Sequence, residues 1–236
     1  MFHSRAKDES MTGKNLFDDL PETYDQWFTT PIGRLVKTYE ANMIMDLLRP
    51  APGDRILDAG CGTGIFTLDI LARKAAVVGL EISLPMLQRA KRKFEMYPFR
   101  PVIGDITNLP FADDVFDKAV SITAIEFITD AGRAIEELLR VTKPGGCLVV
   151  ATLNRLGSWA VQRKERAGMG QSRIFREAFF RSPDELSDIV PLEGVVKTAI
   201  HFQRNDDPKR AMAIESEGRQ KGLRTGAFVI GRWVKP

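Results

Sequence analysis

The chain has 236 residues, of which 44% are hydrophobic and 28% charged, and it carries a formal net charge of +3. These values are ordinary for a soluble globular protein and fit one large domain, or one domain with a cap. No apolar run approaches the roughly 20 residues that a membrane-spanning helix needs, and residues 1–15 lack the apolar centre of a secretory signal. The two cysteines, Cys61 and Cys147, show no metal-ligand spacing, so we expect a reducing, cytoplasmic compartment and no metal site.

The first fifty residues are predicted to form a tail followed by helices. Residues 1–15 are polar and are expected to be a flexible tail. Residues 16–48 are predicted to be mostly helical, with breaks at Pro21 and Pro31. Between residues 32 and 48 apolar side chains recur at helical spacing: Leu35, Val36, Tyr39, Met43, Leu47.

Beyond residue 50, short apolar runs alternate with helical patterns. The predicted strands are Arg55–Ala59, Ala76–Leu80, Pro101–Ile103, Phe116–Ile122 and Cys147–Thr152. The predicted helices are Ile65–Arg73, Pro85–Glu95 and Ala131–Val141, and residues 143–146 are predicted to form a turn. This strict alternation predicts an α/β fold with a parallel sheet covered by helices on both faces.

The last third of the chain has a different pattern. Residues 153–191 are helical and basic, and Ser182-Pro183-Asp184-Glu185 is a strong helix start. From Leu153 onward the chain holds sixteen Lys and Arg against ten Asp and Glu. The basic stretch is either a solvated helix face or a wall that attracts an anionic substrate or a nucleic acid. Val195–Phe202 and Ala227–Val234 are predicted strands, and the polar residues 203–226 between them are predicted to be a functional loop.

The run ILDAGCGTG at residues 56–64 is the most informative motif in the chain. It places an apolar strand directly before three glycines at alternate positions, Gly60, Gly62 and Gly64. Such glycines permit a sharp turn and a close approach of the backbone to a nucleotide-type ligand. A phosphate-binding loop would need Gly-Lys-Ser/Thr next, and a dinucleotide fingerprint would need a third, later glycine, whereas this chain has Ile65 and Phe66.

At this motif the chain resembles the class I S-adenosylmethionine-dependent methyltransferases. The LPFADDVFD run at residues 109–117 and the LRVTKPGG run at residues 139–146 are similar to signatures of the methyltransferase type 11 group, which includes the ubiquinone and menaquinone methyltransferases. The resemblance covers roughly residues 55–152. It implies a Rossmann-like, doubly wound, mostly parallel seven-stranded sheet in a single domain. That domain would comprise a lid segment (residues 16–50), a cofactor-binding core (51–152), a helical cap segment (153–191) and two last strands (192–236).

The resemblance also implies which residues hold S-adenosylmethionine. An acid at Glu81, at the end of the second strand, can accept both ribose hydroxyls, as in dinucleotide folds. Asp58 would lie near the cofactor amino group, and Asp105 with Ile106 would hold the adenine. The full set of predicted cofactor-binding residues is Tyr24, Arg34, Asp58, Gly60, Cys61, Gly62, Gly64, Glu81, Ile82, Met86, Asp105, Ile106, Thr123.

Three residues are candidates for a catalytic role on the acceptor side. Glu126 lies just after the fourth predicted strand. Three roles are open for it: a general base, a group that binds a cationic acceptor, or a cap of the next helix. Tyr24 lies in a YDQWF segment that resembles the N-terminal lid of type 11 members. His201, on the sixth predicted strand, is either a third catalytic candidate or an ordinary packed histidine.

The sequence therefore predicts a methyltransferase that acts on a small molecule, lipophilic or anionic, as a monomer or homodimer, and that yields S-adenosylhomocysteine. Because the sulfonium leaving group is already good, most of the catalysis is expected from in-line positioning of the acceptor. Three alternatives stay open: an RNA or protein methyltransferase that docks through its basic cap, a non-catalytic S-adenosylmethionine-binding module, and a nicotinamide-dependent dehydrogenase. Nucleic acid is a possible partner but not the favoured one.

Overall fold

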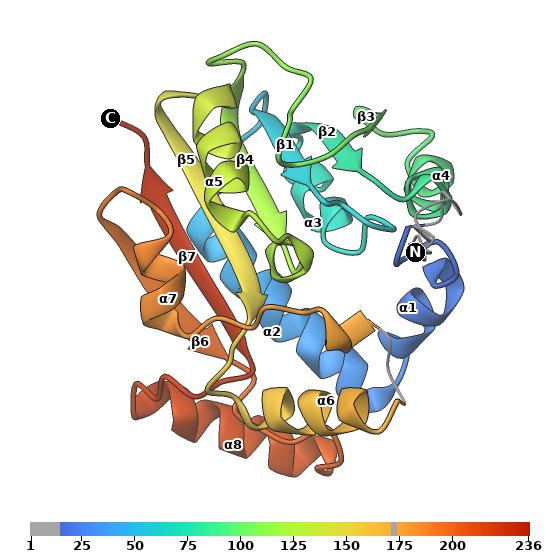
Figure 1. The fold of residues 1–236 in the computed structure, drawn as a ribbon, viewed down its shortest axis with the longest axis vertical. Helices are drawn as coiled ribbons and strands as arrows, with labels where there is room; N and C mark the ends of the chain where they lie inside the picture. The colour runs from blue at the N-terminus through green and yellow to red at the C-terminus, as the bar shows by residue number, and fades with distance from the viewer. Residues whose placement is uncertain (1–14, 171–173) are drawn as a thin grey trace, which may run out of the picture.

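The computed structural model describes residues 15–170 and 174–236 and is built around one seven-stranded sheet (Figure 1). The strand order is β3-β2-β1-β4-β5-β7-β6. Only β7 runs antiparallel to its neighbours β5 and β6, and the remaining pairs are parallel. The strands are β1 (Arg55–Ala59), β2 (Ala76–Glu81), β3 (Phe99–Ile103), β4 (Phe116–Ile122), β5 (Thr142–Leu153), β6 (Gly194–Ala199), β7 (Phe228–Val234). The predicted doubly wound, mostly parallel sheet is confirmed.

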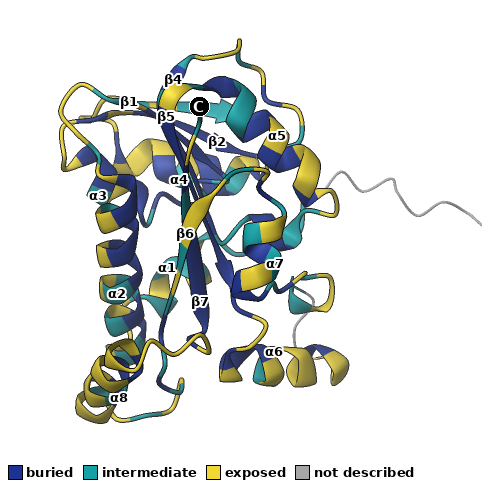
Figure 2. Ribbon diagram, turned by 90° about the vertical axis from the view of Figure 1, so that its left-hand side faces the viewer, coloured by how far each residue is buried: buried dark blue, intermediate teal, exposed yellow. Residues whose placement is uncertain are grey.

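The helices cover both faces of this sheet (Figure 2). In chain order they are α1 (Pro21–Trp27), α2 (Pro31–Leu48), α3 (Thr67–Leu71), α4 (Leu84–Lys93), α5 (Ala131–Val141), α6 (Ser158–Gly168), α7 (Pro183–Asp188), α8 (Pro208–Gln220), with short 3₁₀ turns η1 (Ile125–Phe127) and η2 (Ile174–Arg176). Within the described ranges, no helix is long and apolar enough to cross a membrane.

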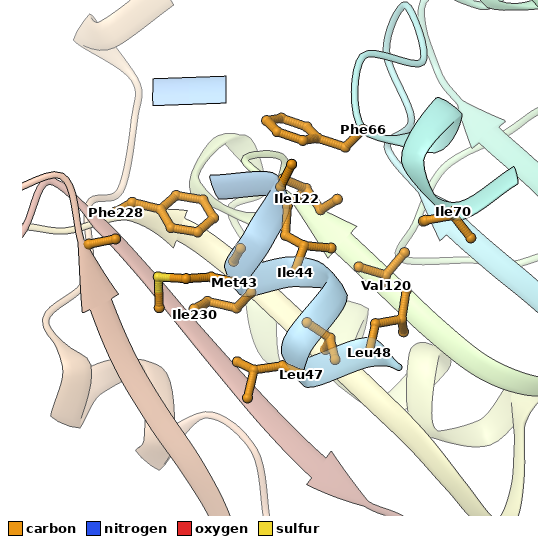
Figure 3. Close-up of a cluster of buried hydrophobic side chains, with 14 of the residues drawn as sticks. Met43, Ile44, Leu47, Leu48, Phe66, Ile70, Val120, Ile122, Phe228 and Ile230 are labelled. Atoms are coloured by element: carbon orange, nitrogen blue, oxygen red, sulfur yellow. The ribbon is translucent and has the colours of Figure 1, made fainter. Parts of the chain in front are cut away.

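Two hydrophobic clusters hold the layers together. The first joins α2, α3 and α8 to one face of the sheet, and Figure 3 shows its centre: Met43, Ile44, Leu47, Leu48, Phe66, Ile70, Val120, Ile122, Phe228, Ile230. The second joins α5 and α7 to the opposite face, with Ile135, Leu138 and Leu186 fully buried. Because apolar side chains of both faces of β1, β4 and β5 are buried, the strand ends are held rigidly at the edge where the polar motif residues lie.

Several helices begin where the sequence supplies a cap. Thr30, before Pro31, accepts the N–H of Gly33 at 3.0 Å, and α2 starts there. Ser182 and Glu185 form a reciprocal capping box at the start of α7, as predicted. Ser83 caps α4, so that helix starts soon after the acid that ends β2.

The prediction of a functional loop at residues 203–226 is wrong, because most of it is helix α8. Asp207 caps this helix by accepting the N–H groups of Lys209 and Arg210, and Pro208 follows at the first helical position. The signal was therefore present in the sequence. Strand β6 also ends at Ala199, three residues earlier than predicted, because Ile200 adopts a left-handed backbone conformation with φ of 66°.

Two boundaries in the core also differ from prediction. The turn expected at residues 143–146 is an irregularity inside β5, where the pairing with β4 jumps from Thr142 to Cys147 and Gly145 has φ of 75°. The helix expected at Ile65–Arg73 is only Thr67–Leu71, because the glycine loop continues into an open turn before it.

Candidate active site

The glycine loop leaves β1 at the edge where all the parallel strands end. Gly60 and Gly62 have φ of 78° and 54°, a conformation that favours glycine. A Cβ on Gly60 would lie 2.5 Å from the Cβ of Ala124, whereas one on Gly62 would meet nothing within 4 Å. The N–H groups of Gly60 and Cys61 both donate to the carbonyl of Leu80, at 2.7 and 3.0 Å, which ties the loop to β2. The backbone at Gly62 is thereby left open to a ligand.

A cavity of about 530 Å³ lies over this loop, and we call it the cofactor cavity. Of the predicted cofactor-binding residues it is lined by Tyr24, Asp58, Gly60, Cys61, Gly62, Glu81, Ile82, Met86, Asp105, Ile106, Thr123. Gly64 does not line it, since its positive φ serves close packing against the ring of Phe94. Arg34 is exposed on α2 and is not brought to the cavity either.

Two acids lie under the loop in different environments. The Glu81 carboxylate accepts the N–H groups of Gly62 and Ser83, both at 2.9 Å, and is almost buried. Burial raises its pKa, and these N–H groups oppose that rise. Asp58 accepts the hydroxyl of Thr67 at 2.6 Å, and burial raises its pKa to about 6. Both carboxyl groups are thus positioned before any ligand arrives.

The other end of the cofactor cavity is largely apolar. Met86 and Ile106 are buried, while the side chain of Ile82 is 46% exposed. Asp105 accepts the N–H of Thr107 at 2.8 Å, which fixes the turn that follows β3. Apolar side chains with a carboxylate nearby suit a flat ring with polar edges.

The lid segment contacts the glycine loop, helix α4 and the turn after β4. Asp25 on α1 accepts the Thr63 hydroxyl at 2.5 Å and forms ion pairs with Arg89 and Lys93 at 2.5 and 2.7 Å. The ring of Phe17 packs against the ring of Phe127 with a centroid distance of 4.9 Å. Sequence analysis missed Asp25 and Phe17, although Asp25 stands in the YDQWF segment that drew attention to the lid.

A second cavity of about 280 Å³ lies beside the first, under the cap segment, and we call it the acceptor cavity. Four residues line both cavities: Phe17, Tyr24, Thr123, Phe127. The walls are mostly apolar and aromatic, and they come from the lid segment, α2, the end of β4, the cap segment and the end of β6. The two cavities therefore meet at the C-terminal end of β4.

Glu126 lines the acceptor cavity and is completely buried. One carboxylate oxygen accepts the Thr152 hydroxyl at 3.0 Å, and the other has no hydrogen-bond partner among the described residues. Burial raises its pKa to about 7. Tyr24 and Thr123 line the same cavities, and burial raises the pKa of the Tyr24 phenol. Glu126 does not cap α5, because Asp130 takes that position.

Two charged residues of the acceptor cavity were not predicted. Glu40 on α2 is buried, and burial raises the pKa of its carboxyl to about 8. The guanidinium of Arg163 on α6 lies 5.3 Å from the ring centroid of Trp159 and 5.1 Å from that of Phe175. Burial lowers the pKa of Arg163 to about 10, and the negative charges of Glu40 and Glu126 oppose this decrease. The signal for Glu40 was a charged residue within the apolar stripe of its helix.

His201 is not brought to either cavity. Its ring bonds to the buried carboxylate of Glu215 on α8 at 3.0 Å and to the carbonyl of Leu223 at 3.2 Å. Gly218 packs against the same ring. This arrangement accounts for His201 as a side chain that anchors α8, and that helix was the element missing from the sequence prediction.

The sequence of this chain is similar to those of several known proteins. A family model described as a methyltransferase domain matches residues 57–150. The malonyl-[acyl-carrier protein] O-methyltransferase of Erwinia pyrifoliae is 30% identical over 80% of this chain and 83% of its own length. The demethylmenaquinone methyltransferase of Renibacterium salmoninarum is 36% identical over 58% of this chain, which spans only 56% of that relative.

The fold also matches a solved structure over nearly its whole length. A SAM-dependent methyltransferase of Thermotoga maritima, described as a possible histamine N-methyltransferase, superposes with a TM-score of 0.71. The two sequences are 26% identical, and the match covers 93% of this chain and 98% of that one. These relatives differ in what their names say they methylate, so the shared feature is the methyl donor.

Proposed function

This chain belongs to the S-adenosylmethionine-dependent methyltransferases, and we propose that it transfers the methyl group to a small molecule held in the acceptor cavity. The observation that carries the proposal is the wall shared by the two cavities, formed by Phe17, Tyr24, Thr123 and Phe127. A ligand on either side of this wall would approach the other at the end of β4, which is the geometry that a direct transfer needs.

The residues of the cofactor cavity fit S-adenosylmethionine. The open backbone at Gly62 suits the methionyl and ribose portion, and Glu81 supplies a carboxylate for two hydroxyl groups. Asp105 and the apolar pair Ile106 and Met86 suit an adenine ring. When bound, this cofactor supplies an activated methyl group on a positively charged sulfur.

On the acceptor side, the proposed general base is Glu126. Its free carboxylate oxygen and its pKa of about 7 suit a group that accepts a proton near neutral pH. Tyr24, which lines both cavities, is proposed to hold the lid segment against both ligands and so to exclude water from the transfer. Most of the rate enhancement then comes from alignment of the acceptor, since the leaving group needs no help.

Methyl-labelled S-adenosylmethionine, incubated with the protein and a cell extract, tests this proposal. Label recovered in the small-molecule or organic fraction is the expected result. Label in RNA or protein would instead favour a macromolecular acceptor docked on the basic cap segment. Binding of the donor without any transfer, across extracts of varied source, would contradict the enzymatic proposal.

A second measurement separates chemistry from binding at Glu126. Replacement of Glu126 by Gln keeps the volume of the side chain but removes the proton acceptor. We expect kcat to fall about a hundredfold, the lower end of what a general base contributes, and the acidic limb of the pH–rate profile to disappear. A rate and a profile equal to those of the wild type would refute the role of Glu126 as the base.

A further inference from the structure

Two carboxyl groups from distant parts of the chain line the acceptor cavity. Glu40 comes from the middle of α2 and Glu126 from the turn after β4. Glu40 is 6% exposed and Glu126 is 0% exposed. The negative charge of each raises the pKa of the nearby Tyr24 phenol. Buried carboxyl groups are rare without a partner because their desolvation is costly. A pair of them in one cavity therefore points to a ligand that compensates the charge.

The interior of this cavity holds two buried acids and one half-buried base. Arg163 favours the charged form of both acids, but it forms no ion pair with either of them in the part of the chain that the structure describes. Two further arginines, Arg166 and Arg204, line the same cavity but are exposed, so water screens their charges. An anionic acceptor would lie next to the two buried acids, whereas a cationic acceptor would compensate their charge.

The aromatic walls suit a cation as well. Arg163 already rests over the rings of Trp159 and Phe175, and Arg204 lies over Trp27 with its guanidinium 5.9 Å from the ring centroid. Four further rings line the cavity next to the two acids: Phe17, Tyr24, Phe28, Phe127. Aromatic faces together with carboxylates form the environment that binds ammonium groups in proteins.

We propose that the acceptor is a protonated amine, which Glu40 and Glu126 bind through its ammonium group and which is methylated on nitrogen. This inference rests on the proposed function and names its substrate class. The ammonium gives one proton to the Glu126 carboxylate, and the nitrogen lone pair then forms a bond to the methyl carbon. The carbon–sulfur bond breaks, its electrons go to sulfur, and the products are an N-methyl ammonium and neutral S-adenosylhomocysteine. The positive charge of the ammonium favours the ionised form of Glu40, which then positions the substrate.

Matched ligands test the substrate class directly. Calorimetry with the S-adenosylhomocysteine-bound protein compares hexylamine with hexanol and hexanoate, and 2-phenylethylamine with 2-phenylethanol and 3-phenylpropanoate. Each amine is expected to bind at least tenfold more tightly than its alcohol and its acid, and to receive label from methyl-labelled S-adenosylmethionine. An amine that binds no more tightly than its neutral counterpart, or does not bind at all, overturns the inference.

Two variants of opposite charge sharpen the test. Glu40→Gln is expected to weaken amine binding about tenfold, and Arg163→Gln is expected to preserve or strengthen it. The matched control is Asp46→Asn, which removes a carboxylate from the exposed face of the same helix and should change neither affinity. An anion-binding site would give the reverse: loss of acceptor binding with Arg163→Gln and no loss with Glu40→Gln.

Failure of this inference is distinguishable from failure of the proposed function. Label transferred to a phenol or an acid in the extract experiment would keep the methyltransferase and exclude the amine. A Glu40→Gln protein that still binds S-adenosylhomocysteine with wild-type affinity is folded, so a lost amine affinity then reports on the acceptor cavity alone. Unchanged amine affinity in that folded variant overturns the role of Glu40.

Discussion

Replacement of Glu81 by Ala gives the sharpest test of the cofactor cavity. In the structure this carboxylate already accepts two backbone N–H groups at 2.9 Å, so it is held in place for the ribose contact that we propose. A hydrogen bond to a charged group contributes about 1.5–3 kcal/mol. We take about 2 kcal/mol as the loss on truncation, which corresponds to an increase of about thirtyfold in the dissociation constant of S-adenosylmethionine.

Isothermal titration calorimetry with S-adenosylmethionine and S-adenosylhomocysteine measures this loss. Glu217→Ala on the exposed face of α8 is the control, since it removes an equal charge far from the cavity. Because truncation of Glu81 also frees the N–H groups of Gly62 and Ser83, the melting temperature must be measured in parallel. Wild-type affinity in a folded Glu81→Ala protein would refute the ribose assignment.

Three further predictions follow from named contacts. Gly60→Ala should lower the melting temperature because its Cβ would collide with Ala124, whereas Gly62→Ala meets no protein atom and should instead weaken cofactor binding, because its Cβ enters the space left for the ligand; thermal melts and calorimetry on the two variants compare them. Asp25→Ala removes the acceptor of three lid contacts, so stopped-flow fluorescence should show release of S-adenosylhomocysteine about tenfold faster, and an unchanged rate would exclude a latch. Burial raises the Glu40 pKa from 4.5 to about 8, so its stabilising contribution is complete below pH 4.5 and is lost as pH rises through 8. Thermal melts of Glu40→Gln should therefore match the wild type at pH 4.5 and exceed it by several degrees at pH 8.5, and parallel curves would contradict the buried ionisation.

The cofactor side of the site could be predicted from sequence because its determinants are local. A strand, alternate glycines and an acid at the end of the next strand lie within residues 56–81, and their roles follow from strand ends that share one edge of the sheet. The same logic failed for Arg34, which was assigned by resemblance of a short segment. Its place on the exposed face of α2 depends on how that helix packs, which the segment does not specify.

The residues of the acceptor cavity could not be predicted from the sequence in this way. His201 was considered for catalysis because α8 was not predicted, and without that helix its partner Glu215 was unknown. Glu40 was overlooked although it interrupts the apolar stripe of α2, with Val36 four residues before it and Ile44 four residues after. A charged residue in a buried stripe marks either a structural ion pair or a site, and only the packing of α2 against the cap segment distinguishes them.

The cofactor cavity and the acceptor cavity draw their charged residues from different parts of the chain. The family model matches residues 57–150, which include the glycine loop, Glu81 and Glu126 but neither Glu40 nor Arg163. The latter two lie on helices that flank the matched region, in the lid and cap segments. Since the strand ends form the cofactor cavity, a change in these flanking helices can alter the charge of the acceptor cavity without disturbing the cofactor cavity. The Glu40→Gln and Arg163→Gln pair therefore tests the proposal that these flanking helices decide what is methylated.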